Sequence, residues 1–454
     1  MLEKHYSEEL VIMDYNREKK VVKFGGSSLS CDKQFIKSAA IIKADESRRF
    51  VVPSAPGKRF ADDIKITDML IKCYELSVGN GDYTEVFGQI RDRYDSIIEG
   101  LSLNIDLDGE YSVIQKELSE GTTLDYIASR GEYLNGILLA SFIGYEFIDA
   151  SDVIFFDENG RYNAEKTNLI MSDRLSKTDR AVIPGFYGSR PDGSIKTFSR
   201  GGSDITGAIV ARAVMADVYE NWTDVSGFFM CDPKIVSNPR HIKVITYREL
   251  RELSYMGAGV LHEDSIFPVK HAGIPINIRN TNKPSDLGTM IVTSSEECDH
   301  QNIVTGIAGK KGFSIIRIEK DMMNQEKGFG MRVLRVFNDM DMSFEHLPSG
   351  IDTMCVVIAE KEIKGKEKEI LTRIAKEVNP DNMDIETDIG LIAVVGRGMI
   401  SKPGTAHRIF KAIAADNINV RMIDQGSSEL NIIIGVYEKD FGRTIELIYN
   451  EFCC

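Results

Sequence analysis

Two glycine-serine motifs, far apart in the chain, carry the residue types needed to hold a phosphate. They are Lys23-Phe24-Gly25-Gly26-Ser27-Ser28 and Ser199-Arg200-Gly201-Gly202-Ser203-Asp204. Each follows a short extended stretch, so each is expected to be a turn at the end of a strand, where backbone without side chains approaches an anion. One motif adds a lysine, and the other adds an arginine and an aspartate. Together they indicate a phosphate-handling site built from both halves of one domain.

The elements that must position these motifs alternate between strand and helix. Strands are expected at 20–24, 50–54, 145–150, 181–187, 196–198, 217–222 and 275–279, and helices at 34–44, 122–144, 203–216 and 246–257. Such alternation predicts a largely parallel sheet with helices on both faces.

The second part of the chain contains an internal repeat. A polar, acidic stretch at 293–301 is typical of a domain boundary. Beyond it, the order strand, glycine turn, helix, strand occurs twice, at 313–319, 328–338 and 353–359, and again at 390–395, 402–415 and 430–436. This repeat predicts two small α+β modules.

Composition excludes several classes of partner. The 454 residues carry a net charge of -14, and 43% are hydrophobic, so neither nucleic acid nor an anionic membrane is expected as a non-specific partner. No apolar run reaches the roughly 20 residues that cross a bilayer, and the first twenty residues lack a signal-peptide core, which favours the cytoplasm. The seven cysteines form no CxxC and are expected to be reduced thiols, and the seven histidines lack the spacing of a zinc site.

Several motifs in the same order give the chain a family resemblance. The chain resembles the monofunctional aspartate kinases of the amino acid kinase superfamily over nearly its whole length, and its tail resembles tandem ACT domains. Besides the two motifs above, the matching segments are Ser129-Arg130-Gly131-Glu132, Trp222-Thr223-Asp224-Val225 with Asp232-Pro233, and Met256-Gly257-Ala258 with Val260-Leu261-His262.

The resemblance implies a fold and a division into domains. The fold is an α/β three-layer αβα sandwich with a mainly parallel sheet, followed by two α+β ACT domains of the ferredoxin-like type. The implied parts are an N-terminal extension at 1–19, a catalytic domain at 20–298, a first ACT domain at 313–383, and a second ACT domain made of 302–310 plus 385–454. ACT domains of the family associate between subunits, so a homodimer or a dimer of dimers is expected.

The resemblance also implies an activity and its cofactors. The expected reaction is the ATP-dependent phosphorylation of the side-chain carboxylate of L-aspartate to 4-phospho-L-aspartate, the entry step to lysine, threonine and methionine synthesis. Magnesium is implied by the reaction, with phosphates and water doing most of the coordination and no protein-held metal cluster expected. The chain contains neither a Walker A sequence nor a protein-kinase catalytic loop.

Two residues are candidates for catalysis, and each has an ordinary alternative. Lys23 is expected to bridge the β- and γ-phosphates and to stabilise charge in the transition state, although a lysine at a strand end can also be simply solvated. Asp204 is expected to hold Lys23 in place and to contact the substrate ammonium. Its alternative is an N-terminal helix charge that complements the helix dipole.

Five further residues are candidates for binding aspartate. Arg200 offers a planar fork for a carboxylate, and Ser203 follows it in the same motif. By analogy with the family, Glu132 binds the substrate ammonium, although a glutamate inside a helix is usually a surface residue. Ser54 and Thr67 match hydroxyls that contact the substrate, or else they are ordinary capping hydroxyls. The linker 56–66 is longer than is usual in the family, which makes the match of Thr67 less direct.

The candidate nucleotide contacts fall into two groups. Lys23 and the following glycine turn are assigned to the phosphates, and the segment after Trp222 is assigned to the adenosine. The residues are Lys23, Gly25, Gly26 and Ser27 for the first group and Thr223, Asp224, Phe229 and Lys234 for the second. Gly259 stands where many family members carry a lysine that reaches the nucleotide, and the residue that replaces this cation is left open.

The tail is expected to bind an end-product amino acid that inhibits the enzyme. The candidate contacts are Met323, Phe329, Glu345 and Ser349. Lysine is favoured because Glu345 can pair with a side-chain ammonium, while threonine, or both together, remains open. The alternative for these residues is an ordinary α+β core with a polar rim.

Two other functions stay open at this point. Another enzyme of the superfamily would share the catalytic scaffold but would lack the paired ACT tail. A catalytically inactive amino-acid sensor is a second alternative, which Gly259 leaves open but which the presence of Lys23, Glu132, Arg200 and Asp204 disfavours.

Overall fold

The computed structural model describes residues 18–199, 201–258, 267–293, 303–400, 402–426 and 428–453. The chain forms two compact units, which are treated separately below. Unit 1 comprises residues 1–226 and 264–287, and unit 2 comprises residues 227–263 and 288–454. Within the described residues, no helix combines the length and the apolar character that a bilayer span requires.

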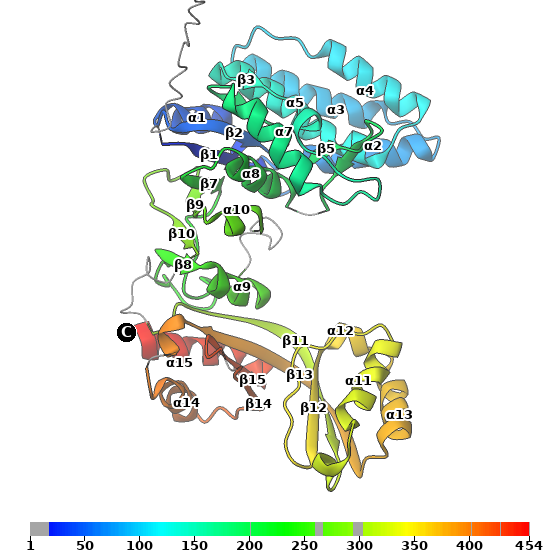
Figure 1. Ribbon diagram of the computed structural model, residues 1–454, viewed down its shortest axis with the longest axis vertical. Helices are drawn as coiled ribbons and strands as arrows, with labels where there is room; N and C mark the ends of the chain where they lie inside the picture. The colour runs from blue at the N-terminus through cyan, green and yellow to red at the C-terminus, as the bar shows by residue number, and fades with distance from the viewer. Residues whose placement is uncertain are drawn as a thin grey trace, which may run out of the picture. The chain divides into compact units, whose positions relative to one another are not determined.

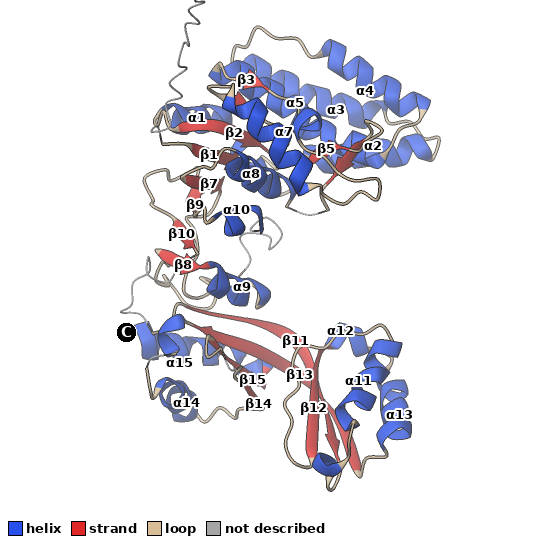
Figure 2. Cartoon of the chain, viewed as in Figure 1, coloured by secondary structure: helices blue, strands red, loops and turns tan. Residues whose placement is uncertain are grey.

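Unit 1 is an α/β structure in which helices outnumber the short strands (Figure 2). Its strands are β1 (Lys20–Phe24), β2 (Arg48–Pro53), β3 (Glu146–Phe147), β4 (Ala181–Val182), β5 (Tyr187–Ser189), β6 (Ile195–Thr197), β7 (Val218–Thr223) and β9 (Ile276–Asn280). Its helices are α1 (Asp32–Lys43), α2 (Ile66–Val78), α3 (Thr84–Gly100), α4 (Asp108–Glu120), α5 (Leu124–Ile143), α6 (Ala150–Val153), α7 (Ala164–Ser176), α8 (Gly202–Ala213) and α10 (Phe267–Ala272), with a 3-10 turn at Gly26–Leu29.

Six strands of unit 1 form one parallel sheet in the order β3, β4, β2, β1, β7, β9. The strands are buried on both faces, which explains their nearly continuous apolar runs. Because neighbouring side chains of a strand alternate between faces, Val22 and Phe24 face the helical cluster that contains α5, whereas Val21 and Lys23 face the opposite side. Helix α8 packs on β1, β2 and β7. Helices therefore cover both faces of the sheet, as expected.

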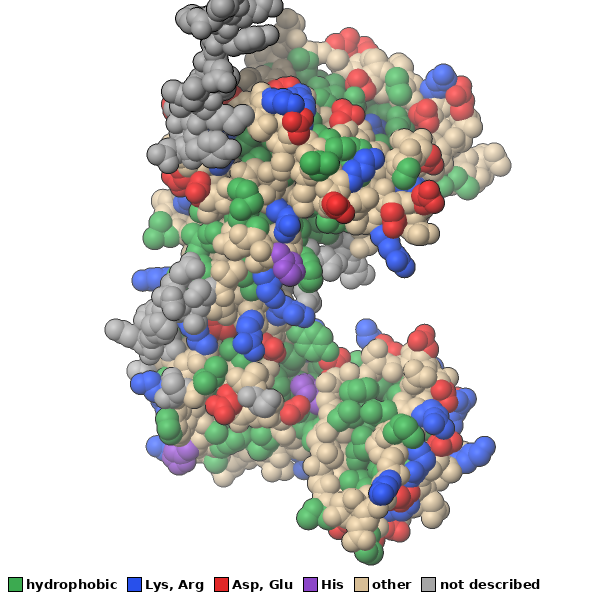
Figure 3. All heavy atoms as spheres, in the orientation of Figure 1, with side chains coloured by type: hydrophobic (Ala, Val, Ile, Leu, Met, Phe, Trp, Pro, Cys, Tyr) green, Lys and Arg blue, Asp and Glu red, His purple; other side chains and the backbone are tan. Residues whose placement is uncertain are grey.

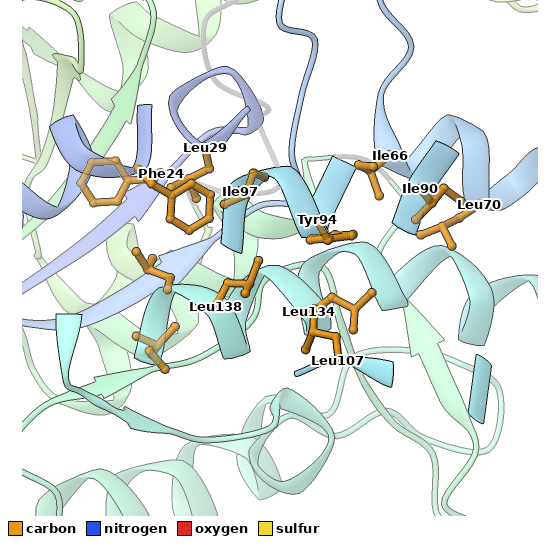
Figure 4. Close-up of a cluster of buried hydrophobic side chains, with 14 of the residues drawn as sticks. Phe24, Leu29, Ile66, Leu70, Ile90, Tyr94, Ile97, Leu107, Leu134 and Leu138 are labelled. Atoms are coloured by element: carbon orange, nitrogen blue, oxygen red, sulfur yellow. The ribbon is translucent and has the colours of Figure 1, made fainter. Parts of the chain in front are cut away.

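A hydrophobic core of unit 1 extends from β1 to the helices on one face of the sheet (Figure 4). Phe24 and Leu29 belong to the same cluster as side chains of α2, α3 and α5, among them Tyr94 and Leu134. The Tyr94 hydroxyl donates to the Gly131 carbonyl over 2.7 Å, which joins α3 to the middle of α5. On the outside of these helices, Figure 3 shows acidic and basic side chains interspersed over unit 1.

Three expected strands differ from the structure. In the segment 145–150 only Glu146–Phe147 forms a strand, because Asp149 already caps α6 by accepting from the Ser151 amide. The segment 181–187 is divided between β4 and β5. The segment 196–198 corresponds to β6, which pairs antiparallel with β5 in a separate two-stranded sheet. Capping and turn hydrogen bonds therefore shorten strands that an apolar pattern extends too far.

Unit 2 contains two parts of the expected catalytic segment, residues 227–263 and the residues from 288 onward, together with the whole repeated tail. Its strands are β8 (Val244–Thr246), β10 (Thr289–Val292), β11 (Gly306–Glu319), β12 (Thr353–Ala359), β13 (Asn382–Val395), β14 (Met422–Asp424) and β15 (Asn431–Tyr437). Its helices are α9 (Tyr247–Tyr255), α11 (Phe329–Asp339), α12 (Glu360–Ile363), α13 (Glu367–Val378), α14 (Thr405–Ala415) and α15 (Phe441–Cys453). Strands β8 and β10 pair in parallel.

The two modules of the tail share one antiparallel sheet in the order β12, β11, β13, β15, β14. Strands β11 and β13 are long enough to run through both modules (Figure 1). The first part of β11 pairs with Leu391–Val395, and the part from Phe313 onward pairs with Asn382–Ile389 and with β12. Helices α11 and α13 cover one half of the sheet, and α14 and α15 cover the other. The domain limits expected from the sequence stay a prediction.

Candidate active site

A cavity of about 620 Å³ opens in unit 1 at the carboxyl ends of β1, β2 and β7. These strands are parallel, so their carboxyl ends meet at one edge of the sheet, where ligands of open α/β sheets bind. The cavity is lined by Gly25, Gly26, Ser27, Ser54, Ala55, Pro56, Gly57, Lys58, Arg59, Phe60, Ala61, Lys65, Thr67, Glu132, Thr223 and Asp224. The structure thus brings together eight of the residues expected at the site.

Lys23 and Asp204 form an ion pair next to this cavity. The Lys23 Nζ lies 2.6 Å from the Asp204 Oδ1, and both side chains are largely buried. The same carboxylate oxygen accepts a hydrogen bond of 2.8 Å from the side-chain amide of Asn221. The Tyr219 hydroxyl donates to the backbone carbonyl of Asp204 over 3.1 Å. Asp204 therefore holds Lys23 beside Gly25, where a Cβ would lie 3.6 Å from the lysine nitrogen.

In the first glycine turn, neighbouring backbone leaves no room for a side chain at Gly26. The Gly25 amide donates to the Trp222 carbonyl over 3.0 Å, which ties the turn to β7. A Cβ on Gly26 would lie 2.8 Å from the Ala55 carbonyl oxygen and 3.1 Å from the Gly57 backbone, closer than a side-chain carbon normally comes. The second turn needs glycine for another reason, since Gly201 has φ 59° where it caps α8. These requirements explain Gly26 in the first motif and Gly201 in the second.

Strand β7 is held by a buried network under the site. Arg48 and Trp222 both donate to the Glu220 Oε2 over 2.8 Å, and the Arg279 guanidinium lies 4.6 Å from the centre of the Trp222 ring. A buried carboxylate with several charge-assisted hydrogen bonds fixes the strand rigidly. Thr223 and Asp224 follow directly and enter the cavity from this supported end.

Glu132 is a buried acid that lines the cavity. It lies on α5 and is only 6% exposed. Burial raises its pKa to about 8, although a hydrogen bond from the Ala55 amide and the charge of Lys23 act in the opposite direction. Among the described residues its buried Oε2 has no hydrogen-bond partner. A buried acceptor without a partner, facing a polar cavity, is the group that a ligand ammonium would satisfy.

Ser54 and Thr67 line the same cavity from β2 and α2. The Ser54 amide donates to the Phe24 carbonyl over 3.0 Å, and its carbonyl accepts from the Asn135 side chain over 2.6 Å. Thr67 is the second residue of α2, so it does not cap that helix; the N-cap position is Lys65. Ser203 is buried on α8, where it leaves no room for a side chain on Gly185.

Other expected residues lie elsewhere. Arg200 and Gly259 are outside the described residues. Phe229 and Lys234 belong to unit 2, where the Phe229 ring meets the His241 ring edge to face and the Lys234 amide donates to Asp232 over 2.9 Å. Their part in nucleotide binding stays a prediction.

The effector candidates are divided between two places in unit 2. Met323 and Phe329 are buried in one apolar cluster with Met354, to which Ser349 is joined by a β-bridge. Glu345 instead lines a separate cavity of about 520 Å³ with Lys310, Lys311, Gly312, Phe313, Ala359, Glu360, Lys361 and Lys364. Its carboxylate accepts a short hydrogen bond from the Tyr255 hydroxyl. The binding of an effector by these residues stays a prediction.

Sequence reasoning missed several residues of the active-site region. Asn221 orients Asp204, Asn135 holds Ser54, and three cations of the loop after β2, Lys58, Arg59 and Lys65, line the cavity. The unusual length of that loop and its concentration of lysine and arginine were the available signals. Among the described residues, no group of three or more histidine, cysteine, aspartate or glutamate side chains could hold a metal ion.

Two family profiles match the chain. The amino acid kinase family matches residues 18–280, and an ACT domain matches residues 392–452. Aspartokinase 3 of Bacillus subtilis is 38% identical, with 95% of this chain and 98% of that protein aligned. The chain belongs to the aspartate kinases. It is therefore an enzyme, and the fold expected from the sequence is confirmed.

Solved structures agree with this assignment. The aspartate kinase of Clostridium acetobutylicum matches with a TM-score of 0.90 and 48% identity over 96% of this chain and all of that one. Aspartokinase III of Escherichia coli, solved with aspartate and ADP, matches with a TM-score of 0.71 over 96% of this chain and 99% of that one, and at 23% identity this likeness concerns the fold. The bifunctional aspartokinase/homoserine dehydrogenase 1 of Zea mays is 27% identical over 95% of this chain, which spans half of that protein.

Proposed function

We propose that the cavity at the carboxyl ends of β1, β2 and β7 is where this aspartate kinase transfers the γ-phosphoryl group of ATP to the side-chain carboxylate of L-aspartate. The observation that carries the proposal is the arrangement of Lys23, held by Asp204, next to a glycine turn on one side and the unsatisfied Glu132 on the other. The turn and the lysine suit phosphates, and the glutamate suits an ammonium.

The chemistry requires two anions to meet. Lys23 and the Gly26 amide counter the negative charge of the terminal phosphate as charge moves during transfer, and this differential stabilisation lowers the barrier. Glu132, with Ser54 and Thr67, orients aspartate so that its side-chain carboxylate points at the phosphorus. Arg200 and Ser203 remain assigned to the substrate carboxylate, and Thr223, Asp224, Phe229 and Lys234 to the nucleotide.

Magnesium belongs to this proposal. Ser27, Thr223 and Asp224 offer hydroxyl and carboxylate oxygens at the cavity, which are the donors that magnesium prefers, and one carboxylate beside nucleotide phosphates is a common arrangement for this ion. When bound, magnesium supplies charge neutralisation on the phosphates.

Regulation by an end product is the second part of the proposal. The relative from Clostridium acetobutylicum is described as allosteric, and Escherichia coli aspartokinase III has been solved with lysine and aspartate. We therefore propose that lysine, or alternatively threonine, binds the ACT modules of this chain and inhibits it, in a cytoplasmic homodimer or dimer of dimers that catalyses the first step of lysine, threonine and methionine synthesis.

The catalytic proposal is tested by replacing Lys23. In an assay of ADP release with aspartate, glutamate or no acceptor, the wild type should respond to aspartate alone. Lys23→Ala should lower kcat roughly 100-fold or more, since it removes a cation used in the transition state. Lys37→Ala serves as the matched control. Lys37 lies on α1, and its ammonium donates a hydrogen bond to the side chain of Asn282. Near-normal turnover by a folded Lys23→Ala protein contradicts the role of Lys23.

A further inference from the structure

The loop between β2 and α2, residues 54–65, packs against the Gly25-Gly26 turn, which is called the phosphate turn below. Its ends meet where the Ile66 amide donates to the Pro56 carbonyl over 3.2 Å. The Gly57 amide donates to the Gly26 carbonyl over 2.8 Å, and the backbones of these two glycines touch. A compact surface loop whose ends lie together is an Ω-loop, a type that is frequently functional. In this chain the loop begins against the Gly25-Gly26 turn, which is proposed to face the nucleotide phosphates.

A buried arginine holds this loop from inside. Arg93 on α3 is 4% exposed and donates to both oxygens of Asp63 over 2.8 and 2.9 Å. It also donates to the carbonyls of Gly57, over 3.1 Å, and Ile64, over 3.3 Å. Burial alone would raise the pKa of Asp63, but hydrogen bonds from Arg59 and the charge of Arg93 hold that pKa well below its ordinary value. The loop is therefore clamped at its beginning and its end by an ionised pair.

The same aspartate orients Arg59 toward the cavity. Asp63 accepts from the Arg59 amide and Nε, both over 2.9 Å, and from its Nη2 over 3.1 Å. The Nη1 edge of the guanidinium is not part of this pair. The Arg59 side chain is 41% exposed and lines the cavity together with Lys58 and Lys65.

Charge makes this arrangement suitable for an anion. One carboxylate is shared by two arginines, so the group of Asp63, Arg59 and Arg93 keeps a net positive charge. Glu132 and Asp224 are the acids that line the same cavity. A guanidinium held by one edge keeps its other edge available for a phosphate oxygen, with little conformational entropy left to lose on binding.

We propose that Arg59 binds the terminal phosphate of the nucleotide, opposite the Gly25-Gly26 turn, and that Asp63 and Arg93 are positioning residues that present it. This inference rests on the proposed function of the cavity. Arg59 adds a cation to the transfer reaction besides Lys23, supplied by a loop of unusual length.

The test compares Arg59→Ala with Arg91→Ala in the full-length protein. Arg91 lies on α3 in a surface ion pair with Asp95 and Asp108 and does not line the cavity. Arg59→Ala should lower kcat/KM for ATP about tenfold or more, and should weaken binding of the non-hydrolysable triphosphate AMP-PNP about tenfold with a much smaller effect on ADP. Arg59→Lys should recover part of the loss, and Arg91→Ala should behave as the wild type in both measurements.

A double-mutant cycle tests the positioning role. Asp63→Asn should reduce the preference for AMP-PNP over ADP, and it should add little to Arg59→Ala if the aspartate acts through that arginine. Thermal unfolding of each variant separates loss of fold from loss of contact. Equal affinities of Arg59→Ala and Arg91→Ala for AMP-PNP overturn the inference, even where the wild type is an active aspartate kinase. A wild type that binds AMP-PNP but phosphorylates only another acceptor contradicts the proposed function. The AMP-PNP affinities of Arg59→Ala and Arg91→Ala still test the role of Arg59 in that case.

Discussion

At the scale of single residues, Glu132 is the group whose chemistry depends most on its surroundings. Burial raises its pKa to about 8, so the carboxyl group is largely protonated at neutral pH before substrate arrives. An ammonium that approaches the unsatisfied Oε2 favours the ionised form. Under the proposed function, binding of the aspartate ammonium to Glu132 is therefore coupled to the loss of a proton.

This coupling predicts the pH dependence of substrate use. As pH falls from about 8 to 6, kcat/KM for aspartate should decline with a slope approaching tenfold per pH unit. Glu132→Gln should raise the KM for aspartate about tenfold or more and should flatten the profile in this range. Initial rates between pH 6 and 9 check both statements, and an unchanged profile in Glu132→Gln contradicts them.

The raised pKa of Glu132 also makes the free energy of unfolding depend on pH. Because the folded pKa lies above the ordinary value of 4.5, the folded state holds a proton that the unfolded state has lost between about pH 4.5 and 8. Glu132 therefore makes the free energy of unfolding decrease as pH rises through this window. Glu132→Gln should remove this contribution, which urea unfolding at pH 5 and pH 8 measures.

Sequence reasoning reached Lys23 and Glu132 through motifs, but it did not reach their environments. The burial of Glu132 depends on α5 packing against the loop after β2, where Gly131 leaves no room for a side chain beside Ala55. The pair of Asp63 and Arg93 joins a loop to a different helix. Pairs of this kind leave no periodic signal, so only the folded chain reveals them.

At the scale of elements, the glycine contact between the phosphate turn and the loop after β2 sets the shape of the cavity. A Cβ on Gly57 would lie 2.6 Å from the Gly26 carbonyl carbon and 2.8 Å from the Ser27 amide nitrogen. Backbone atoms cannot move aside as a flexible side chain can. A substitution at this position must therefore separate the two segments.

We expect Gly57→Ala to impair catalysis more than folding. The displaced turn should lower kcat/KM at least tenfold, while the free energy of unfolding should fall by about 1–3 kcal/mol, as is usual for overpacking. Gly88→Ala on α3 is the control, since nothing lies within 4 Å of its Cβ position and alanine favours a helix by roughly 0.5–1 kcal/mol. Steady-state kinetics and urea unfolding of both variants provide the comparison.

The elements themselves were largely predictable. Helices α1, α5, α8, α9, α11 and α14 lie within a few residues of the ranges expected from their apolar periodicity. Side-chain caps also mark the start of α5 and α9. In α9, for example, Thr246 and Glu249 form a capping box. Short strands were less predictable, because a two-residue strand such as β3 is defined by its neighbour rather than by its own sequence.

At the scale of the whole molecule, unit 2 is joined internally by buried polar contacts. Glu249 of α9 is fully buried and accepts from Thr305 and from Arg397, both over 2.6 Å. At the other end of α9, the Tyr255 hydroxyl donates to Glu345. Helix α9 is thus hydrogen-bonded to residues of both tail modules, and under the proposed regulation a ligand bound near Glu345 would act on a helix that is already held at its other end.

The proposed feedback predicts a response that depends on Glu345. Millimolar lysine or threonine should reduce turnover of the wild type, and Glu345→Ala should lose the response. Tyr255→Phe is the matched variant, because it removes the hydrogen bond but keeps the carboxylate and should retain inhibition. Titrations of activity with each amino acid distinguish the cases; no response to either one defeats the regulatory proposal.

The 14-residue strand β11 also has a consequence for synthesis of the chain. Ribosomes release residues in order, yet Gly306–Lys310 find their partners only in Leu391–Val395, and these in turn pair with β15. The module that contains Gly306–Lys310 is therefore incomplete until β13 and β15 have both been synthesised. Nascent chains that stop early therefore carry an apolar strand edge that invites aggregation, and premature stop mutations in this gene should yield insoluble products rather than an unregulated enzyme.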